Sequence, residues 1–422
     1  MRARGMDSDG PGRYLRRMAA PHPTIRFLDR RTPPHVATLV TVTGLSALTM
    51  NVFLPSLPAM TEWFATDYRL MQLSVSLYLG VSAALQIVIG PVSDRFGRRS
   101  VLLWSFALFL VATAGTLLAG DVTTFLAFRM MQAVIAAGMV LSRAVIRDMV
   151  PAEQAASMIG YVTMGMAFVP MVGPMIGGAL DEAFGWQANF ALLFLLGLGI
   201  LWMIWADLGE TAAGHRARFA DQARQYPELL ASPRFWGYCL AAAFASGAFY
   251  AYLGGAPYVG SEVFHLPPGR LGLYLGAPAL GYAAGNFLAG RYSAHYGIDR
   301  MILAGTLLTT AGMAILALLS LAGLAGANVF FGLIVTVGFG NGMALPGANA
   351  GMLSVRPGLA GTASGLGGAI MIGGGAAISA AAGWVLGLGG GAAPLALLMF
   401  ACSAASVASI LLVLRRARRL GL

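Results

Sequence analysis

One short polar segment interrupts the apolar sequence and combines a carboxylate with three guanidinium groups. It reads Gly90-Pro-Val-Ser-Asp94-Arg95-Phe-Gly97-Arg98-Arg99. Glycine permits tight turns and a close approach of helices, which we expect at both glycines of this segment. A carboxylate is stabilised against the N-terminus of a neighbouring helix. The pattern predicts a charged contact between helices, whereas the simpler alternative is that the arginines only fix a topology.

A second group of charges follows about fifty residues later. Arg147 and Asp148 end an apolar stretch, and Glu153 begins the next one after Pro151. We interpret these charges as a cluster close to the Asp94 segment. A merely solvated pair is the alternative.

Two arginines fall inside an apolar stretch at 122–146. A charged side chain at membrane depth costs about 3 kcal/mol or more and normally faces a cavity or a partner. Arg129 lies in the outer third of this stretch, three residues before Gln132, so we predict that it faces a cavity. Its alternative is to extend its charged end to the nearby interface. Arg143 is closer to the polar Arg147 turn, where we expect it to do so.

Polar and aromatic residues are scattered through the apolar stretches. Walls that are uncharged and rich in methionine and aromatic groups suit flexible, apolar or aromatic ligands. Any one of these residues can equally be a packing residue, so their common bias is the signal. The predicted substrate-binding residues are Asn51, Phe53, Tyr78, Gln86, Arg129, Gln132, Tyr161, Tyr250, Tyr258, Tyr274, Asn286 and Asn341.

The residues that an enzyme would need are not grouped in the sequence. Active sites require clustered metal ligands or acid–base pairs. The five histidines are scattered through the tail, loops and span ends, and the two cysteines, Cys239 and Cys402, lie inside apolar stretches. No lysine is present, so the phosphate-binding loop Gly-x4-Gly-Lys-Ser/Thr cannot occur. We expect no enzyme, no metal site, no cofactor and no nucleic-acid partner.

The elements that position these residues are membrane helices. The chain has 422 residues, of which 58% are hydrophobic and only 10% are charged, against roughly 25% charged in soluble proteins. A span needs about 20 apolar residues. This predicts twelve spans near 36–60, 70–92, 101–119, 122–146, 153–180, 187–206, 235–259, 270–292, 302–322, 326–350, 358–386 and 392–414.

The arginines lie mostly on one side of this arrangement. They crowd the N-terminal tail, the 207–234 segment and the C-terminal end. The positive-inside rule therefore predicts that both termini are cytoplasmic. The net charge of +10 reflects this bias and does not indicate nucleic acid.

Two halves of six spans are separated by the longest internal polar segment. Residues 200 apart match in several places, such as Gly97 with Gly297 and Gln86 with Asn286, while Ala294 replaces Asp94 in the second copy. Such repeats place a substrate site at the midplane between the halves. The predicted divisions are a basic cytoplasmic tail (1–35), a first bundle (36–206), a cytoplasmic connector (207–234), a second bundle (235–414) and a basic tail (415–422).

Several of these segments resemble the major facilitator superfamily over residues 36–414. The Asp94 segment is similar to its loop 2–3 signature, and Arg129-Met-Met-Gln132 with Gly138 resembles its fourth-span motif. Asn51-Val-Phe-Leu-Pro55-Ser-Leu-Pro58 is similar to the first span of the Bcr/CflA drug exporters. A glycine-rich run in this chain resembles a fifth-span motif of proton-driven exporters. Its residues are Gly165, Gly173, Pro174, Gly177 and Gly178.

The resemblance implies roles for these residues. The acid at Asp94 would bond loop arginines and the start of the eleventh span, which latches the cytoplasmic side. Arg129 would serve coupling or substrate contact. The fifth-span glycines would form an antiporter-type seal between the halves; packing of small residues without such a role is the alternative. The predicted latch residues are Gly90, Asp94, Arg95, Gly97, Arg98, Arg99, Asp148 and Glu153.

One position departs from the family pattern. Bcr/CflA proteins usually carry an acid where this chain has Asn51, and none of the acids here falls in the middle of a predicted span. A proton-coupled carrier needs a group that changes protonation, which Asn51 cannot supply. We therefore expect a carboxylate at a span end, first among them Glu62, Asp148 and Glu153, to carry the proton.

Together these features predict an all-α polytopic membrane protein of the major facilitator fold. We expect a monomeric multidrug exporter in the bacterial inner membrane, with small molecules as substrates, the lipid bilayer as its surroundings and protons as the coupling ion. A carrier of one specific metabolite with the same fold is the alternative.

Overall fold

The structure is a computed structural model that describes residues 26–149, 169, 172–211, 226–356 and 360–419. Within these ranges the regular structure is entirely helical, and ten helices are long and apolar enough to cross a membrane. The predicted all-α polytopic fold is confirmed. The fifth predicted span lies largely outside the described residues, and the eighth consists of two shorter helices.

Helices of the first half follow the predicted spans closely. The first span is broken, because Pro55 and Pro58 have no N–H to donate to the helix. It consists of α2 (Val36–Asn51), the 3-10 turn η1 (Leu54–Ser56) and α3 (Leu57–Trp63). The others are α4 (Tyr68–Phe96), α5 (Arg98–Leu118), α6 (Val122–Gln132), the turn η2 (Ala133–Ile135), α7 (Ala136–Met149), a helix over 172–184 and α9 (Gln187–Asp207).

In the second half, the span predicted near 270–292 is interrupted. Pro278 begins a new helix, and a proline has no N–H to continue the hydrogen bonds of the preceding one. The interrupted pair is α13 (Pro268–Gly276) and α14 (Pro278–Tyr296). The remaining elements are α11 (Tyr226–Leu230), α12 (Pro233–Tyr258), the π-helical turn η3 (Val259–Val263), α15 (Ile298–Leu321), α16 (Ala327–Ser354), α17 (Ala360–Leu386) and α18 (Ala393–Arg419).

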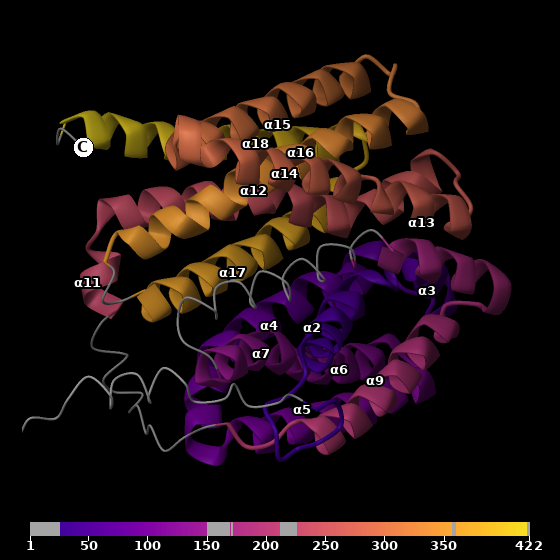
Figure 1. The fold of residues 1–422 in the computed structure, drawn as a ribbon. Coiled ribbons are helices and arrows are strands. Elements are labelled where there is room, and N and C mark those ends of the chain that lie inside the picture. Colours follow the sequence, from indigo (N-terminus) through magenta and orange to yellow (C-terminus); the bar gives the residue numbers. More distant parts are fainter. Residues whose placement is uncertain (1–25, 150–168, 170–171, 212–225, 357–359, 420–422) are drawn as a thin grey trace, which may run out of the picture.

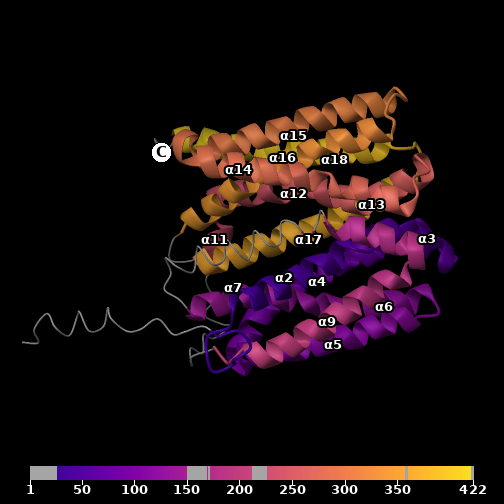
Figure 2. The same ribbon diagram turned by 45° about the vertical axis from the view of Figure 1, so that its right-hand side comes forward.

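The two halves lie side by side. Figures 1 and 2 show the indigo-to-magenta helices of the first half on one side and the orange-to-yellow helices of the second half on the other. Helices α4 and α17 pack against each other where the halves meet. We call the end of the bundle that holds Arg98 and Asp207 the connector end. The opposite end, where α3 and the start of α13 lie, is the distal end.

The same backbone hinge occurs once in each half. Gly97 joins α4 to α5 with φ 91° and ψ 143°, and Gly297 joins α14 to α15 with φ 85° and ψ 152°. Each glycine N–H donates to a serine carbonyl four residues earlier, Ser93 or Ser293, at 2.9 Å. Residues other than glycine rarely adopt this φ. The internal repeat predicted from the 200-residue offset is therefore visible in the backbone.

Candidate functional site

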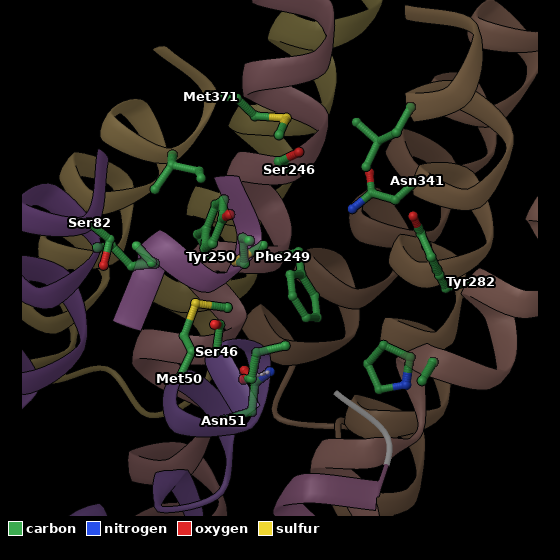
Figure 3. Close-up of a pocket in the computed structure, with 18 of the residues that line it drawn as sticks. Ser46, Met50, Asn51, Ser82, Ser246, Phe249, Tyr250, Tyr282, Asn341 and Met371 are labelled. Carbon is green, nitrogen blue, oxygen red and sulfur yellow. Dashed lines mark hydrogen bonds between the residues drawn. The ribbon is translucent and has the colours of Figure 1, made fainter. Parts of the chain in front are cut away.

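A cavity of about 290 Å³ lies between the two halves at the middle of the bundle (Figure 3). Helices α2, α4 and α7 line it from the first half, and α12, α13, α14, α16 and α17 from the second. The described residues of its wall are apolar, aromatic or uncharged polar residues, and none carries a charge. Such a wall offers apolar contacts and a few hydrogen-bonding groups.

Five of the predicted substrate-binding residues line this cavity: Asn51, Tyr78, Gln86, Tyr250 and Asn341. Sequence reasoning missed several other lining residues. One signal was available on α4, where Tyr78, Ser82 and Gln86 are spaced by four and so share one helix face. The missed residues include Ser46, Met50, Ser82, Ser246, Phe249, Tyr282 and Met371.

Other predicted residues lie away from the described cavity wall. The Tyr258 ring packs on Tyr68 at 4.9 Å, and the Tyr274 ring stacks on Phe331 at 4.8 Å. Asn286 donates to the carbonyl of Tyr282 in its own helix at 2.8 Å. These contacts are typical of packing residues. Tyr161, Gly165 and Glu153 lie outside the described residues.

Arg129 is completely buried behind the cavity wall. Its Nε donates to the Ser74 carbonyl at 3.2 Å and one terminal nitrogen to the Thr49 carbonyl at 2.9 Å. The other terminal nitrogen donates to Gln132 Oε1 at 2.7 Å. Among the described residues no carboxylate forms an ion pair with it. The guanidinium therefore joins α2, α4 and α6 through neutral acceptors rather than reaching the membrane interface.

Two aromatic rings enclose the same guanidinium. Its Cζ lies 4.3 Å from the Phe53 ring centre and 4.1 Å from that of Tyr78. Such cation–π contacts stabilise a desolvated cation. Gln132 in turn donates to Thr113 Oγ1 at 2.9 Å, which extends the network to α5. Because Tyr78 lines the cavity, its ring lies between the Arg129 guanidinium and the cavity.

Glycines bring the two halves into backbone contact near the distal end. A Cβ on Gly178 would lie 3.2 Å from the Cα of Gly272 and would collide with the Pro268 carbonyl. On the same helix, a Cβ on Gly177 would collide with the Val52 carbonyl of the first span. Small residues allow such close helix packing. The 172–184 helix therefore contacts α13 through one face and the first span through another.

Further along this helix, Gly173 approaches Leu48 and Asn51. A Cβ on Gly173 would lie 3.1 Å from Leu48 Cδ1 and 3.7 Å from the Cβ of Asn51. A Cβ on Gly272 would collide with the carbonyl of Pro174. All four described residues of the predicted fifth-span motif thus lie at helix contacts.

Hydrogen bonds between the halves accompany the glycine contacts. Gln72 of α4 donates through Nε2 to the Ser379 carbonyl and hydroxyl of α17, at 2.6 and 2.9 Å. The Tyr68 hydroxyl donates to the Gly254 carbonyl at 3.0 Å. Together with the glycine contacts we call these bonds the distal seal. It joins the halves on one side of the cavity.

At the connector end, Arg98 is the centre of a charged cluster. It forms an ion pair with Asp94, and its Nε lies 3.2 Å from Asp148 Oδ2. Its backbone N–H donates to Glu210 Oε1 at 2.8 Å. The structure therefore brings together Asp94 and Asp148, which are 54 residues apart in the sequence, and adds the connector residue Glu210, which sequence reasoning missed.

The other arginines of this segment have separate partners. Arg99 donates to the carbonyls of Leu208 and Trp205 at 2.8 and 3.0 Å. The Arg95 guanidinium lies 5.4 Å from the centre of the Phe96 ring. Arg99 thus fastens the start of α5 to the end of α9.

The expectation for Gly90 needs correction. Gly90 lies inside α4, and no described atom comes within 4 Å of where its Cβ would stand, so it allows no close helix contact here. Gly97 behaves as predicted, because its φ is 91° and a Cβ would collide with the Glu210 carboxylate.

The carboxylates predicted to carry a proton lie away from the cavity. Glu62 is exposed on α3 towards the distal end. Asp148 is about a quarter exposed, at 26%, in the Arg98 cluster. Among the described residues no three His, Cys, Asp or Glu side chains are grouped as a metal site.

The amino-acid sequence is similar to those of several known transporters and resistance proteins. The chain is 31% identical over 254 residues to an uncharacterized MFS-type transporter, YdgK, of Bacillus subtilis. It is 33% identical over 225 residues to a chloramphenicol resistance protein of Pseudomonas aeruginosa. It is 30% identical over 255 residues to the multidrug transporter MdfA of Yersinia pestis. These matches cover 59%, 50% and 59% of this chain and 63%, 51% and 61% of the relatives.

Solved transporters have the same fold at lower identity. A bacterial homologue of the human lysosomal transporter Spinster, in an inward-facing and occupied conformation, gives a TM-score of 0.71 at 17% identity. A D-xylose–proton symporter gives 0.69 at 16% identity, and both alignments cover 90% of this chain and 96% of the other. The family model of the Major Facilitator Superfamily matches residues 39–380. The chain is therefore a member of the Major Facilitator Superfamily.

Proposed function

We propose that this transporter exports amphipathic small molecules by alternating access, in exchange for protons. The observation that carries the proposal is the cavity between the halves, whose described wall is aromatic, methionine-rich and uncharged. A wall of this kind adapts to ligands of varied shape because methionine and aromatic side chains make apolar contacts without strict geometry. The relatives named for chloramphenicol resistance and multidrug transport support the same choice.

The distribution of arginine supports an orientation with both termini in the cytoplasm. The distal seal then lies on the outer side of the inner membrane. The cavity lining reaches from the seal towards the connector end, through Gln86 on α4 and Tyr282 on α14. This arrangement suits loading from the cytoplasmic side, with release after the seal opens and the connector end closes. The transporter works as a monomer in this proposal.

Proton exchange is the second part of the proposal, with a mechanism of the Bcr/CflA type. Asn51 cannot titrate, so the proton is carried by a span-end carboxylate, Glu62, Asp148 or Glu153. Asp148 contacts the Arg98 cluster directly, because its Oδ2 lies 3.2 Å from Arg98 Nε. Protonation of Asp148 removes one of the negative charges beside the Arg98 guanidinium, which loosens the Arg98 cluster at the connector end.

Transport in proteoliposomes tests both parts. Purified protein is reconstituted with a fluorescent amphipathic substrate, and accumulation is followed with and without an imposed pH gradient. We expect accumulation that grows with the gradient and collapses with a protonophore. Transport that ignores the gradient would rule out proton exchange. Movement of one metabolite, with no movement of drugs, would favour the specific metabolite carrier.

A further inference from the structure

We infer that the cavity selects uncharged ligands that carry hydrogen-bond donors beside an aromatic or apolar body, and that it discriminates against organic cations. This rests on the proposed function, since it names the substrate class of the same cavity. Two unpaired acceptors and one buried guanidinium carry the inference.

The first acceptor is the side chain of Asn51, which is fully buried and lines the cavity. Its Nδ2 donates to the Ala47 carbonyl in its own helix at 3.2 Å. That bond fixes the amide orientation, because a carbonyl oxygen cannot accept from another carbonyl oxygen. Asn51 Oδ1 has no hydrogen-bond partner among the described residues. A buried acceptor without a partner is costly, so a donor on the ligand would be well placed here.

The second acceptor comes from the other half. Asn341 of α16 is 5% exposed, lines the cavity, and its Oδ1 also has no partner among the described residues. Figure 3 shows Asn51 and Asn341 on different helices around the pocket, with Phe249 between them in the view and Tyr250 on the far side of Phe249 from Asn341. A ligand with two donors can therefore bond both halves while its ring lies among these aromatic residues.

Charge in and behind the wall disfavours a cation. No described lining residue is an acid, so a cation that leaves water finds no carboxylate to replace its hydration. The buried Arg129 guanidinium lies 4.1 Å from the ring centre of Tyr78, which faces the cavity. One face of Tyr78 is therefore already used by a cation, and the positive charge behind it repels a second one.

Binding to the purified transporter in detergent tests this with three probes. Chloramphenicol is uncharged and has an aromatic ring, two hydroxyl groups and an amide N–H. Its O,O-diacetate keeps the ring and loses the hydroxyl donors. Tetraphenylphosphonium is an aromatic cation without donors. We expect calorimetry to show that chloramphenicol has the highest affinity of the three. The diacetate should bind at least about fivefold more weakly, as the loss of one hydrogen bond predicts, and the cation should also bind at least about fivefold more weakly.

Variants assign the effect to the two amides. Asn51→Leu and Asn341→Leu should each weaken chloramphenicol about fivefold or more and leave the diacetate unchanged. Asn349→Leu is the matched control, because Asn349 is exposed on the same helix α16 and lies outside the described cavity wall. Asn51→Asp, measured at pH 8, should strengthen binding of the cation by supplying a carboxylate.

Three results would overturn the inference. In the first, tetraphenylphosphonium binds the wild type as tightly as chloramphenicol does. In the second, chloramphenicol does not bind. In the third, Asn51→Leu weakens the binding of chloramphenicol and of its diacetate equally. Transport separates this inference from the proposed function. If binding depends on the ligand's hydrogen-bond donors but no substrate is transported in proteoliposomes, the exporter is rejected and the ligand class is kept. If substrates are transported but binding does not depend on donors, the ligand class is rejected and the exporter is kept.

Discussion

Gly178 and Gly272 touch across the two halves with no space for a side chain on either. A Cβ on Gly178 would lie 3.2 Å from the Cα of Gly272, and a Cβ on Gly272 would lie 3.3 Å from the Cα of Gly178. Each would also collide with a backbone carbonyl, that of Pro268 or Pro174. Backbone cannot give way as a flexible side chain can, so closure at this point depends on both residues being glycine.

The first prediction is that Gly178→Leu opens the distal seal. Its side chain would push α13 away, and the population should shift towards a state open at the distal end. The measurement is thiol labelling of Ser379→Cys in a background without Cys239 and Cys402, because Ser379 is fully buried in the seal. Labelling should be at least about tenfold faster with Gly178→Leu.

The control for that variant is Gly199→Leu on α9. No described atom lies within 4 Å of where a Cβ on Gly199 would stand, so the added side chain meets open space. Equal labelling rates in the two variants would show that Gly178 does not hold the seal.

The second prediction concerns the buried guanidinium. Arg129→Ala leaves the carbonyls of Ser74 and Thr49 and the Gln132 Oε1 without their donor, and each unpaired buried group costs about 1–3 kcal/mol. Thermal unfolding of the purified protein should begin well below that of the wild type, and transport should fall strongly. Arg129→Lys should recover only part of both, because lysine cannot reproduce the planar fork.

Arg143→Ala is the comparison for Arg129, since it removes the same guanidinium group 14 residues further along the same predicted span. Arg143 is exposed in the structure, so its loss should lower stability and transport much less. If both alanine variants unfold at the same temperature, the network around Arg129 contributes little.

The third prediction is that Asp94→Asn impairs transport while expression stays normal. The Arg98 cluster would lose a charge-assisted bond worth about 1.5–3 kcal/mol before allowance for solvent screening. Asp67→Asn serves as the control, because Asp67 precedes α4 at its other end and is exposed. Normal efflux by Asp94→Asn, at matched protein levels, would remove the latch role.

The fourth prediction is that Asp148→Asn weakens the response of transport to a pH gradient more than it weakens substrate binding. A neutral amide keeps the side-chain shape and abolishes the titration. Uptake in proteoliposomes at a series of imposed gradients measures the response. If the response persists, Asp148 is not the carrier, and Glu62 and Glu153 are the next residues to neutralise.

The fifth prediction concerns a buried acid at the connector end. Asp207 accepts from the backbone N–H groups of Leu28 and His35, at 2.8 and 2.9 Å, and from the Thr38 hydroxyl at 2.6 Å. Asp207→Asn should lower the unfolding temperature and expose the segment before α2 to protease, because the amide NH₂ would face an N–H donor. Unchanged proteolysis at this segment would contradict the anchoring role.

Most of the fold could be predicted from the sequence, because hydropathy marks whichever residues lie in the membrane. The limits of prediction from hydropathy are clear at α4, which is predicted over 70–92 and observed over Tyr68–Phe96. The helix continues through the polar Ser93, Asp94 and Arg95, beyond the apolar region, until the positive φ of Gly97 ends it. The interruption at Ala277 was missed because the apolar pattern continues across it.

The site could be predicted only in part. Sequence places Tyr78 and Tyr274 equally well inside spans, but only the packing of the halves turns Tyr78 to the cavity and Tyr274 onto Phe331. Met50 and Phe249 were missed, since apolar residues in an apolar span carry no distinguishing signal. Arg129 was noticed for its charge, yet its place behind Tyr78 depends on three helices at once.

The uncharged described wall of the cavity has a consequence for the energy of the proposed export. If neutral cargo leaves in exchange for one proton, each cycle moves one net positive charge into the cell, so the process is electrogenic. The membrane voltage then contributes about 2.3 kcal/mol per 100 mV in addition to the pH difference. Exchange of a monovalent cation for one proton would be electroneutral and would forgo that contribution. If the proposed exchange holds, a pocket whose described wall has no acid thus allows efflux to continue in media where the pH difference has vanished and only the voltage remains.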